Sequence, residues 1–490
     1  MEEKELQLLR ELQKENVWWQ THDVPSRLAR EFKRSDYFVY KDLLKNNKIN
    51  VIIGPRRVGK STLIYQLIQY LIKEENIPPN RILFLSLERA FFEITKSPIT
   101  ESINVYEENI LKEAISSLEK PIYLFIDEAS RNTEWAAILK QFYDLKYNIK
   151  YVVSGSSSPA LYQKGSESLV GRKNDVLILP LKFKDVLRFK HQEIGEDLSA
   201  KGVYLRSKLM QAVNNNSPKE LYDELIKLYT AIGPNIEANL QVAINEYLLM
   251  GGYPEFYDVS ASWEECSKMM REAYFEAIIS YDILKVFGSR NPEKIRRLYI
   301  ILALSTANII SMSKIRKDIG EISRDALDDY FQQLQDTHLV AVSLQYKKNR
   351  RKIGNELKKA YVQDVGMRNA VLGVLEDNIR KSEVLGSLAE TIAQDHLRRL
   401  KLILEPSKKD ELFFWRDNSK RELDFIIELN NKVIPIESKF QETIRSEDIR
   451  VIQAAIEKFN SPFGILLTKK SIHLSNKILS IPLWLFLLIC

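Results

Sequence analysis

A glycine-rich loop near the start of the sequence has the residue types that bind phosphate groups. Gly54 and Gly59 frame the loop, and Lys60 and Ser61 complete the pattern G-x-x-x-x-G-K-[ST]. Glycines let several backbone N–H groups point at one anion, and the N-terminus of the following helix adds its positive end. We expect Lys60 to reach the β- and γ-phosphates and the Ser61 hydroxyl to bind Mg²⁺. The residues predicted to contact the nucleotide are Gly54, Pro55, Arg56, Arg57, Val58, Gly59, Lys60, Ser61 and Thr62.

Two adjacent acids follow a second apolar run. Asp127 and Glu128 come directly after Ile122–Ile126. Asp127 is placed to hold Mg²⁺ through water, and Glu128 to orient or deprotonate the attacking water. Acidic residues after a strand are also common in turns, so these two acids indicate a nucleotide site only because the glycine-rich loop is present as well. Together the two motifs predict ATP and Mg²⁺ as cofactors and ATP hydrolysis as the reaction.

Two more polar residues are candidates for the same site. Ser154 follows the apolar run Tyr151–Val153, where a hydroxyl could sense the γ-phosphate or water; a plain Ser/Gly turn explains this spacing as well. Arg172 is a candidate arginine finger, which would stabilise charge in the transition state; a surface arginine is the competing interpretation.

A second group of charged residues lies far along the chain. Asp424 is in ELDFII, and Glu437 and Lys439 are in VIPIESKF, where alternate residues of a strand share a face. Glu390, on a preceding helix, could be a third acid. Carboxylates beside a lysine could bring a divalent metal, water and a scissile phosphate together. The solvated face of any strand gives the same short pattern, so both interpretations stay open.

The elements that must position these residues fall into three segments of an α/β, multidomain chain. Five short apolar runs at 49–54, 81–87, 121–127, 151–155 and 175–180 alternate with helical stretches, which predicts a parallel sheet covered on both faces. We therefore expect a P-loop NTPase domain with a helical extension over residues 1–245.

The second and third segments differ in their patterns. Helical periods continue to about residue 340, with two short helices joined at Gly320 and then a hairpin from 339–346 and 358–364; this predicts a helical and winged-helix domain over 246–375. A helix at Leu385–Leu400 and strands at 412–417, 422–429, 432–440 and 464–468 predict a smaller α/β domain over 376–490. The apolar end of the chain, 482–490, is too short to cross a bilayer as a helix, and we expect a buried strand there.

The amino-acid composition is compatible with several kinds of partner and identifies none of them. The chain has 490 residues, 45% of them hydrophobic and 28% charged, with a formal net charge of +6. This mild positive charge allows an acidic partner such as DNA without naming one. Cys266 and Cys490 lie far apart, and the histidines lack metal-ligand spacing, so neither a disulfide framework nor a zinc site is indicated. We expect a reducing, cytoplasmic location and no membrane partner.

The motifs together resemble a known family. GPRRVGKST, LFIDEAS, VVSGSSS, SLVGR, GGYPE, KKAYVQDVGMRNA, ELDFII and PIESKF occur in the order seen in archaeal and bacterial AAA-type ATPases, whose C-terminal half is a domain of unknown function with a restriction-endonuclease-like core. The resemblance implies that Ser154 is the sensor and Arg172 the finger. Because such fingers act across subunit interfaces, it also implies a homo-oligomer. It further implies that Asp424 and Glu437 bind metal and that Lys439 positions or activates the nucleophile.

The sequence leaves the macromolecular partner open. The predicted recognition helix, 324–336, carries acids that would face a polyanion, which argues against its entry into the major groove. The basic stretch 347–352 is a better candidate for phosphate contact, although it also fits a solvated turn. Two functions remain: an ATP-driven enzyme acting on DNA, or a nucleotide-dependent switch acting on a protein partner with an inactive nuclease-like scaffold. A DNA-binding regulator without turnover is disfavoured, because a mere binder has no need of Asp127 and Glu128.

Overall fold

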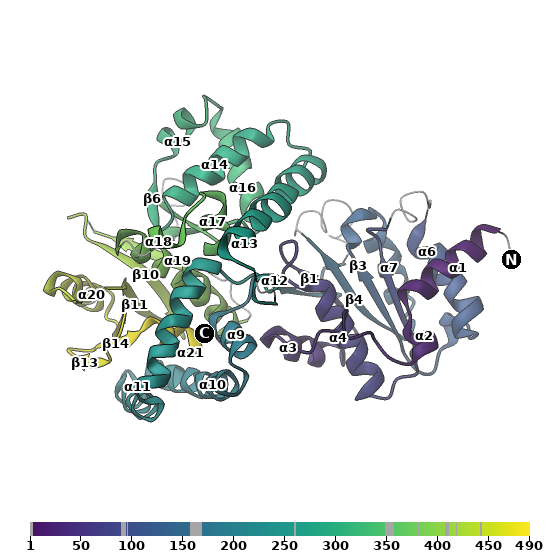
Figure 1. Cartoon of the computed structure of the whole chain (residues 1–490), viewed down its shortest axis with the longest axis horizontal. Coiled ribbons are helices and arrows are strands. Elements are labelled where there is room, and N and C mark those ends of the chain that lie inside the picture. Colours follow the sequence, from purple (N-terminus) through teal and green to yellow (C-terminus); the bar gives the residue numbers. More distant parts are fainter. Residues whose placement is uncertain are drawn as a thin grey trace. The chain divides into compact units, whose positions relative to one another are not determined.

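The chain forms two compact units (Figure 1). The computed structural model describes residues 3–89, 95, 97–156, 169–258, 261–347, 357–379, 382–406, 411–417, 419–441 and 443–490. Unit 1 comprises residues 1–179, 281–289 and 336–338, and unit 2 comprises 180–280, 290–335 and 339–490.

Unit 1 is built on a parallel sheet of five strands. The strands are β1 (Ile49–Ile53), β2 (Ile82–Ser86), β3 (Ile122–Asp127), β4 (Ile149–Gly155) and β5 (Lys173–Leu177). Their order is β2-β3-β4-β1-β5, so β4 lies between the strand before the glycine loop and the strand before the two acids. All five strands predicted from the apolar runs are confirmed. The carboxyl ends of parallel strands meet at one edge of the sheet, which brings the two motifs together.

Helices cover both faces of this sheet, as the unbroken apolar strands require. On one face, Leu8 of α1, Ile99 of α6 and Trp135 of α7 pack in a core with Val51 and Leu124 of the strands. On the other face lie α3 and α4 (Figure 1). The helical elements of unit 1 are α1 (Glu3–Glu15), α2 (Trp18–Thr21), α3 (Ser35–Leu43), α4 (Lys60–Lys73), η1 (Pro79–Arg81), α6 (Pro98–Tyr106), η2 (Glu107–Leu111), η3 (Ile115–Ser117), η4 (Ala129–Arg131) and α7 (Trp135–Asp144).

Unit 2 contains a mixed sheet of nine strands in the order β13-β14-β12-β11-β10-β9-β7-β8-β6. The antiparallel hairpin of β7 and β8 joins the C-terminal strands through a parallel pairing of β7 with β9, at Leu344 and Phe413. The strands are β6 (Asn308–Ile310), β7 (Val340–Gln345), β8 (Lys358–Val362), β9 (Phe413–Arg416), β10 (Glu422–Leu429), β11 (Lys432–Lys439), β12 (Gly464–Thr468), β13 (His473–Ser475) and β14 (Ile478–Pro482).

The helices of unit 2 are more numerous. Within α11, the positive φ of Gly233 and the following Pro234 mark a break between two helical halves. The segment η7 begins in unit 2 and enters unit 1 at Tyr281. The helices are α9 (Phe183–Lys190), α10 (Gln192–Asn215), α11 (Lys219–Met250), α12 (Glu255–Asp258), α13 (Trp263–Met269), η6 (Met270–Phe275), η7 (Ile278–Val286), α14 (Pro292–Leu304), α15 (Met312–Asp318), α16 (Arg324–Asp336), α17 (Val365–Val371), α18 (Glu376–Ile379), α19 (Ser382–Leu404), α20 (Ser446–Phe459) and α21 (Leu483–Ile489).

The predicted elements of the middle segment are present. Two short helices, α15 and α16, precede the hairpin β7–β8, as expected. Their assignment as a winged helix stays a prediction, and so does the division of the chain at 245 and 375. Of the basic stretch 347–352, residues 348–352 lie outside the described residues.

The expected C-terminal strand was wrong. Leu483–Ile489 form helix α21, and every side chain in it is buried. A short apolar run buried on all sides has no amphipathic period, so strand and helix cannot be distinguished from the sequence. None of the helices in the described part of the chain is both long and apolar enough to cross a bilayer.

Candidate functional site

The loop between β1 and α4 has the backbone of an anion cradle. Arg57 and Gly59 adopt the left-handed conformation, with φ of 63° and 96°. Gly54 is required for a different reason, since a Cβ there would lie 2.0 Å from the carbonyl oxygen of Ile178. Within the described chain, no side chain caps the N-terminus of α4 at Gly59. The first N–H groups of this helix are therefore available to an anionic ligand.

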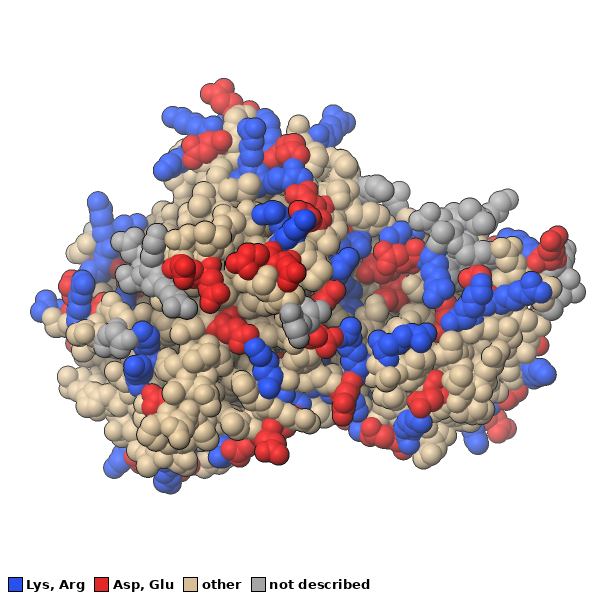
Figure 2. Space-filling view, in the orientation of Figure 1, with Lys and Arg blue, Asp and Glu red and all other residues tan. Residues whose placement is uncertain are grey.

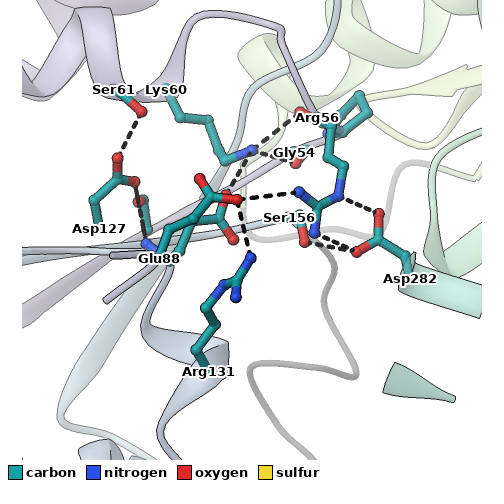
Figure 3. Close-up of polar contacts among 12 residues, drawn as sticks. Gly54, Arg56, Lys60, Ser61, Glu88, Asp127, Arg131, Ser156 and Asp282 are labelled. Carbon is teal, nitrogen blue, oxygen red and sulfur yellow. Dashed lines mark hydrogen bonds and ion pairs between the residues drawn. The ribbon is translucent and has the colours of Figure 1, made fainter. Parts of the chain in front are cut away.

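Lys60 lies over this loop. Its side chain is 5% exposed, and its Nζ donates hydrogen bonds of 3.0 Å to the carbonyl oxygens of Gly54 and Pro55 (Figure 3). The nearest acid is Glu128, with Oε1 at 3.9 Å. The ammonium is thus held at the phosphate-binding loop by neutral carbonyls, which leaves its charge to be matched by a bound phosphate.

The two predicted magnesium ligands are in contact. Ser61, in the first turn of α4, donates a 2.5 Å hydrogen bond through its Oγ to Oδ2 of Asp127, the last residue of β3. Hydroxyl and carboxylate oxygens are the hard donors that Mg²⁺ prefers. The donor set therefore fits Mg²⁺, with Ser61 and Asp127 as the residues that would hold it.

Ser154 links the two acids. It is fully buried on β4, and its hydroxyl donates to Asp127 Oδ1. The backbone N–H of Glu128 donates to Ser154 Oγ at 3.4 Å and to Asp127 Oδ1 at 3.2 Å. The position of β4 between β1 and β3 makes this contact possible. Ser154 therefore fixes the Asp127 carboxylate and the backbone that carries Glu128.

Glu128, the predicted catalytic base, lies beside Lys60 with 12% of its side chain exposed. Burial raises the pKa of its carboxyl above the ordinary value of 4.5, while Lys60 opposes that shift. Its backbone has a φ of 52°, a left-handed conformation that is strained for a residue other than glycine. A carboxylate whose pKa is raised accepts a proton from water more readily than an ordinary glutamate does.

Sequence analysis did not identify Asp282 as part of this site. Arg56 of the glycine loop donates through Nε and Nη2 to Asp282, at 2.9 Å and 3.1 Å, and Ser156 Oγ donates to the same carboxylate at 3.1 Å (Figure 3). The Asp282 side chain is 3% exposed. Asp282 lies 226 positions after Arg56, and no motif marks it.

Three neighbours of Arg56 were also missed. The Arg56 and Arg131 guanidinium carbons lie 4.4 Å and 4.8 Å from the centre of the Tyr281 ring. Glu88 pairs with Arg131 at 2.9 Å and lies 3.9 Å from Arg56. An arginine-rich margin thus adjoins the cradle, where it could contact the outer phosphates of a nucleotide.

Arg172 lies at the other end of β1. Its carbonyl accepts a hydrogen bond from the N–H of Ile49, the first residue of β1, whereas the glycine loop follows the last. Its side chain pairs with Asp144 at 2.7 Å. In its own chain Arg172 is therefore remote from the cradle. Its role as a finger at the site of a second subunit stays a prediction.

The four residues of the proposed second site are brought together in unit 2. Asp424 Oδ2 accepts from the N–H of Ser438 at 3.0 Å, Glu437 accepts from the N–H of Asp424 at 3.1 Å, and Lys439 pairs with Glu437 at 2.6 Å. Glu390 joins them through a shared lysine, Lys359.

Burial dominates the electrostatics of this cluster. Burial and the nearby Asp424 carboxylate raise the pKa of Glu390 and that of Glu437 to about 8. Lys359 and Glu422 also belong to the cluster and were missed, since neither lies in the Asp…Glu-x-Lys pattern. Among the described residues, no group of three or more His, Cys, Asp or Glu is arranged to hold a metal ion.

Comparison with known families assigns most of the chain. Residues 46–187 match the family described as an AAA domain, residues 241–378 match a domain of unknown function, and residues 385–486 match a second domain of unknown function.

The similar curated proteins are uncharacterized. One from Methanocaldococcus jannaschii is 26% identical over 420 residues, which cover 84% of this chain and 79% of that protein. A protein from Haemophilus influenzae is 22% identical, with 84% and 87% covered.

Solved structures are more distant. The Walker-type ATPase of Pyrococcus abyssi is 15% identical with a TM-score of 0.37, covering 72% of this chain and 99% of that one. The ORC1 protein of Aeropyrum pernix, solved in complex with DNA, is 10% identical with a TM-score of 0.29, covering 73% and 96%.

Proposed function

We propose that this chain, which matches an AAA domain over residues 46–187 and a domain of unknown function over residues 385–486, hydrolyses ATP in a Mg²⁺-dependent reaction and uses the cycle for conformational work. The proposal rests on the 2.5 Å hydrogen bond between Ser61 and Asp127, which lies beside the glycine loop whose carbonyls bind the Lys60 ammonium. This hydrogen bond joins the two halves of a nucleotide site that the sequence places 66 residues apart.

Each residue has a distinct task in this reaction. The loop N–H groups and Lys60 hold the β- and γ-phosphates, and Ser61 and Asp127 hold the metal. Bound Mg²⁺ neutralises charge that develops on the phosphate oxygens. Ser154 keeps Asp127 and the Glu128 backbone in place. Glu128 accepts the proton of the attacking water, or orients that water toward the γ-phosphate.

DNA is our first candidate for the molecule on which the ATPase acts. The net charge of +6 permits a polyanionic partner, and the stretch 347–352 supplies cations. Against it, α16 exposes Asp325, Asp328 and Asp329, and basic and acidic side chains are interspersed on the face shown in Figure 2. A protein partner, with the chain acting as a nucleotide-dependent switch, is therefore the second candidate; the exposed acids of α16 favour it.

One set of rate measurements tests both parts. Phosphate release is measured for wild type and for Glu128→Gln, with Mg²⁺ or with EDTA. We expect wild-type turnover only with Mg²⁺ and a loss of about 10²–10⁴-fold in the variant, the usual contribution of a general base. Equal rates for the two proteins would contradict the proposed role of Glu128.

The same assay separates the two partners. Single-stranded, duplex or branched DNA is added to wild type at several salt concentrations. Stimulation that weakens steeply with salt supports work on DNA, because phosphate contacts release counterions. Unchanged turnover with all three forms of DNA favours the switch.

A further inference from the structure

One buried lysine lies at the centre of the acidic cluster in unit 2. Lys359 is on β8, and its side chain is 1% exposed. Its Nζ lies 2.6 Å from Glu390 Oε1, 3.0 Å from Glu422 Oε1 and 3.1 Å from Asp424 Oδ1. Three carboxyl groups therefore lie within ion-pair distance of one buried ammonium, which donates a hydrogen bond to Asp424.

The second oxygen of Asp424 and both oxygens of Glu437 also have partners in the chain. Asp424 Oδ2 accepts from the N–H of Ser438 at 3.0 Å. Glu437 Oε1 pairs with Lys439 Nζ at 2.6 Å, and Glu437 Oε2 accepts from the N–H of Asp424 at 3.1 Å. Asp424 and Glu437 are therefore held by donors of the protein, as buried polar groups usually are.

The lysine is a permanent cation in this setting. Burial alone would lower the pKa of Lys359, but the neighbouring Tyr361, Asp424 and Glu390 together hold that pKa well above 10.5. Burial likewise would raise the pKa of Asp424, yet Lys359 and Lys439 keep it below its ordinary value. The Lys359 Nζ lies 3.1 Å from Asp424 Oδ1, so the two side chains form a direct buried pair.

A divalent metal would need the same oxygens. Mg²⁺ takes oxygen ligands at about 2.0–2.1 Å in an octahedral shell and enters sites that offer carboxylates together with water. Here the Lys359 ammonium already contacts Glu390 and Asp424, and the Lys439 ammonium contacts Glu437, so a metal ion among them would meet like charges at close range. The residues present therefore do not fit a metal centre.

We infer that the Lys359 ammonium holds the position that a divalent cation would take, so that Glu390, Asp424 and Glu437 bind no divalent metal and unit 2 has no metal-dependent nuclease activity. The cluster instead joins β8 to α19 and β10 through buried charge. The inference is independent of the ATPase site, because every residue in it belongs to unit 2.

Removing the internal cation tests this directly. Lys359→Met keeps the length of the side chain and removes its charge, and the neighbouring Lys358→Met is the matched control, since Lys358 is 39% exposed. Mn²⁺ is titrated into the nucleotide-free full chain by calorimetry. We expect Lys359→Met to bind one more Mn²⁺ per chain than wild type and Lys358→Met, with an affinity at least about tenfold higher than any weak binding in those two. A folded Lys359→Met without this gain contradicts the inference.

Wild type provides a second test that does not depend on the folding of Lys359→Met. Mn²⁺ binding and cleavage of single-stranded and duplex DNA are compared between wild type and Asp424→Asn. Equal Mn²⁺ binding and no cleavage by either protein support the inference. Mn²⁺ binding or DNA cleavage by wild type that Asp424→Asn abolishes would overturn it, whatever the outcome of the ATPase assays.

Discussion

The Arg56–Asp282 pair offers a prediction whose size follows from the geometry. Asp282→Asn keeps the shape of the side chain and removes its charge. Arg56 then retains a guanidinium that is 15% exposed and has lost a bidentate carboxylate. Among the described residues, Glu88 stays within ion-pair distance of Arg56, at 3.9 Å, and Glu128 also interacts with its charge. The loop that carries Arg56 is also the predicted phosphate cradle, so the variant changes both stability and nucleotide response.

The expected cost is a few kcal/mol. Removing one partner of a buried ion pair destabilises a protein by about 3–5 kcal/mol, because the other charge stays buried. The partial exposure of Arg56 and the presence of Glu88 reduce this to about 2–3 kcal/mol of unfolding free energy. For a unit of this size the loss corresponds to a fall in Tm of roughly 4–12 °C. Saturating Mg-ATP supplies phosphate oxygens near Arg56, and we expect it to stabilise Asp282→Asn more than wild type.

The assay is thermal unfolding with and without Mg-ATP, combined with hydrogen exchange of peptides that cover residues 49–61. Hydrogen exchange assigns the loss to the loop rather than to unit 2. Glu88→Gln is the control, because Glu88 is 53% exposed and its removal costs less than about 1 kcal/mol. Unchanged Tm and unchanged exchange in Asp282→Asn would refute the reasoning.

Three further predictions concern catalysis. Glu128 must be ionised to act as a base, and its pKa is raised, so turnover should fall as the pH drops through a value above 4.5. The pH profile of kcat should show this acidic decrease for wild type and not for Glu128→Gln. Ser154→Ala removes the hydroxyl that fixes Asp127 and should lower kcat by about 10–100-fold with little change in ATP affinity, measured by calorimetry beside steady-state rates. If Arg172 acts across a subunit interface, Arg172→Ala and Lys60→Ala should each be inactive alone and partly active when mixed; a mixture as inactive as its components would reject that role.

Much of unit 1 could be predicted because its signals are local. The apolar runs of β1 to β4 are nearly continuous, as strands buried on both faces must be, and the loop Gly54–Ser61 follows the first of them directly. The meeting of Ser61 with Asp127 then follows from a parallel sheet, whose strand ends share one edge.

The residues that were missed have partners distant in sequence. Asp282 meets Arg56 only because the segment 281–289 belongs to unit 1, and Lys359 meets Asp424 only because β7 pairs with β9. Neither the Asp282–Arg56 contact nor the Lys359–Asp424 contact corresponds to a fixed spacing of residues, so neither could be predicted from the sequence. The C-terminal run was misassigned for another reason, because uniform burial removes the period that distinguishes helix from strand.

The central claim is that the cradle formed by Gly54–Ser61 holds the triphosphate of a nucleotide that the protein hydrolyses. The most direct test is the rate of phosphate release from Mg-ATP by wild type and by Lys60→Ala, whose folding is checked by circular dichroism. The account predicts measurable wild-type turnover and a loss of at least about 100-fold in the variant, the usual effect of removing one charged donor from a phosphate site. Equal turnover by the two folded proteins, or no ATP hydrolysis by wild type, would contradict it.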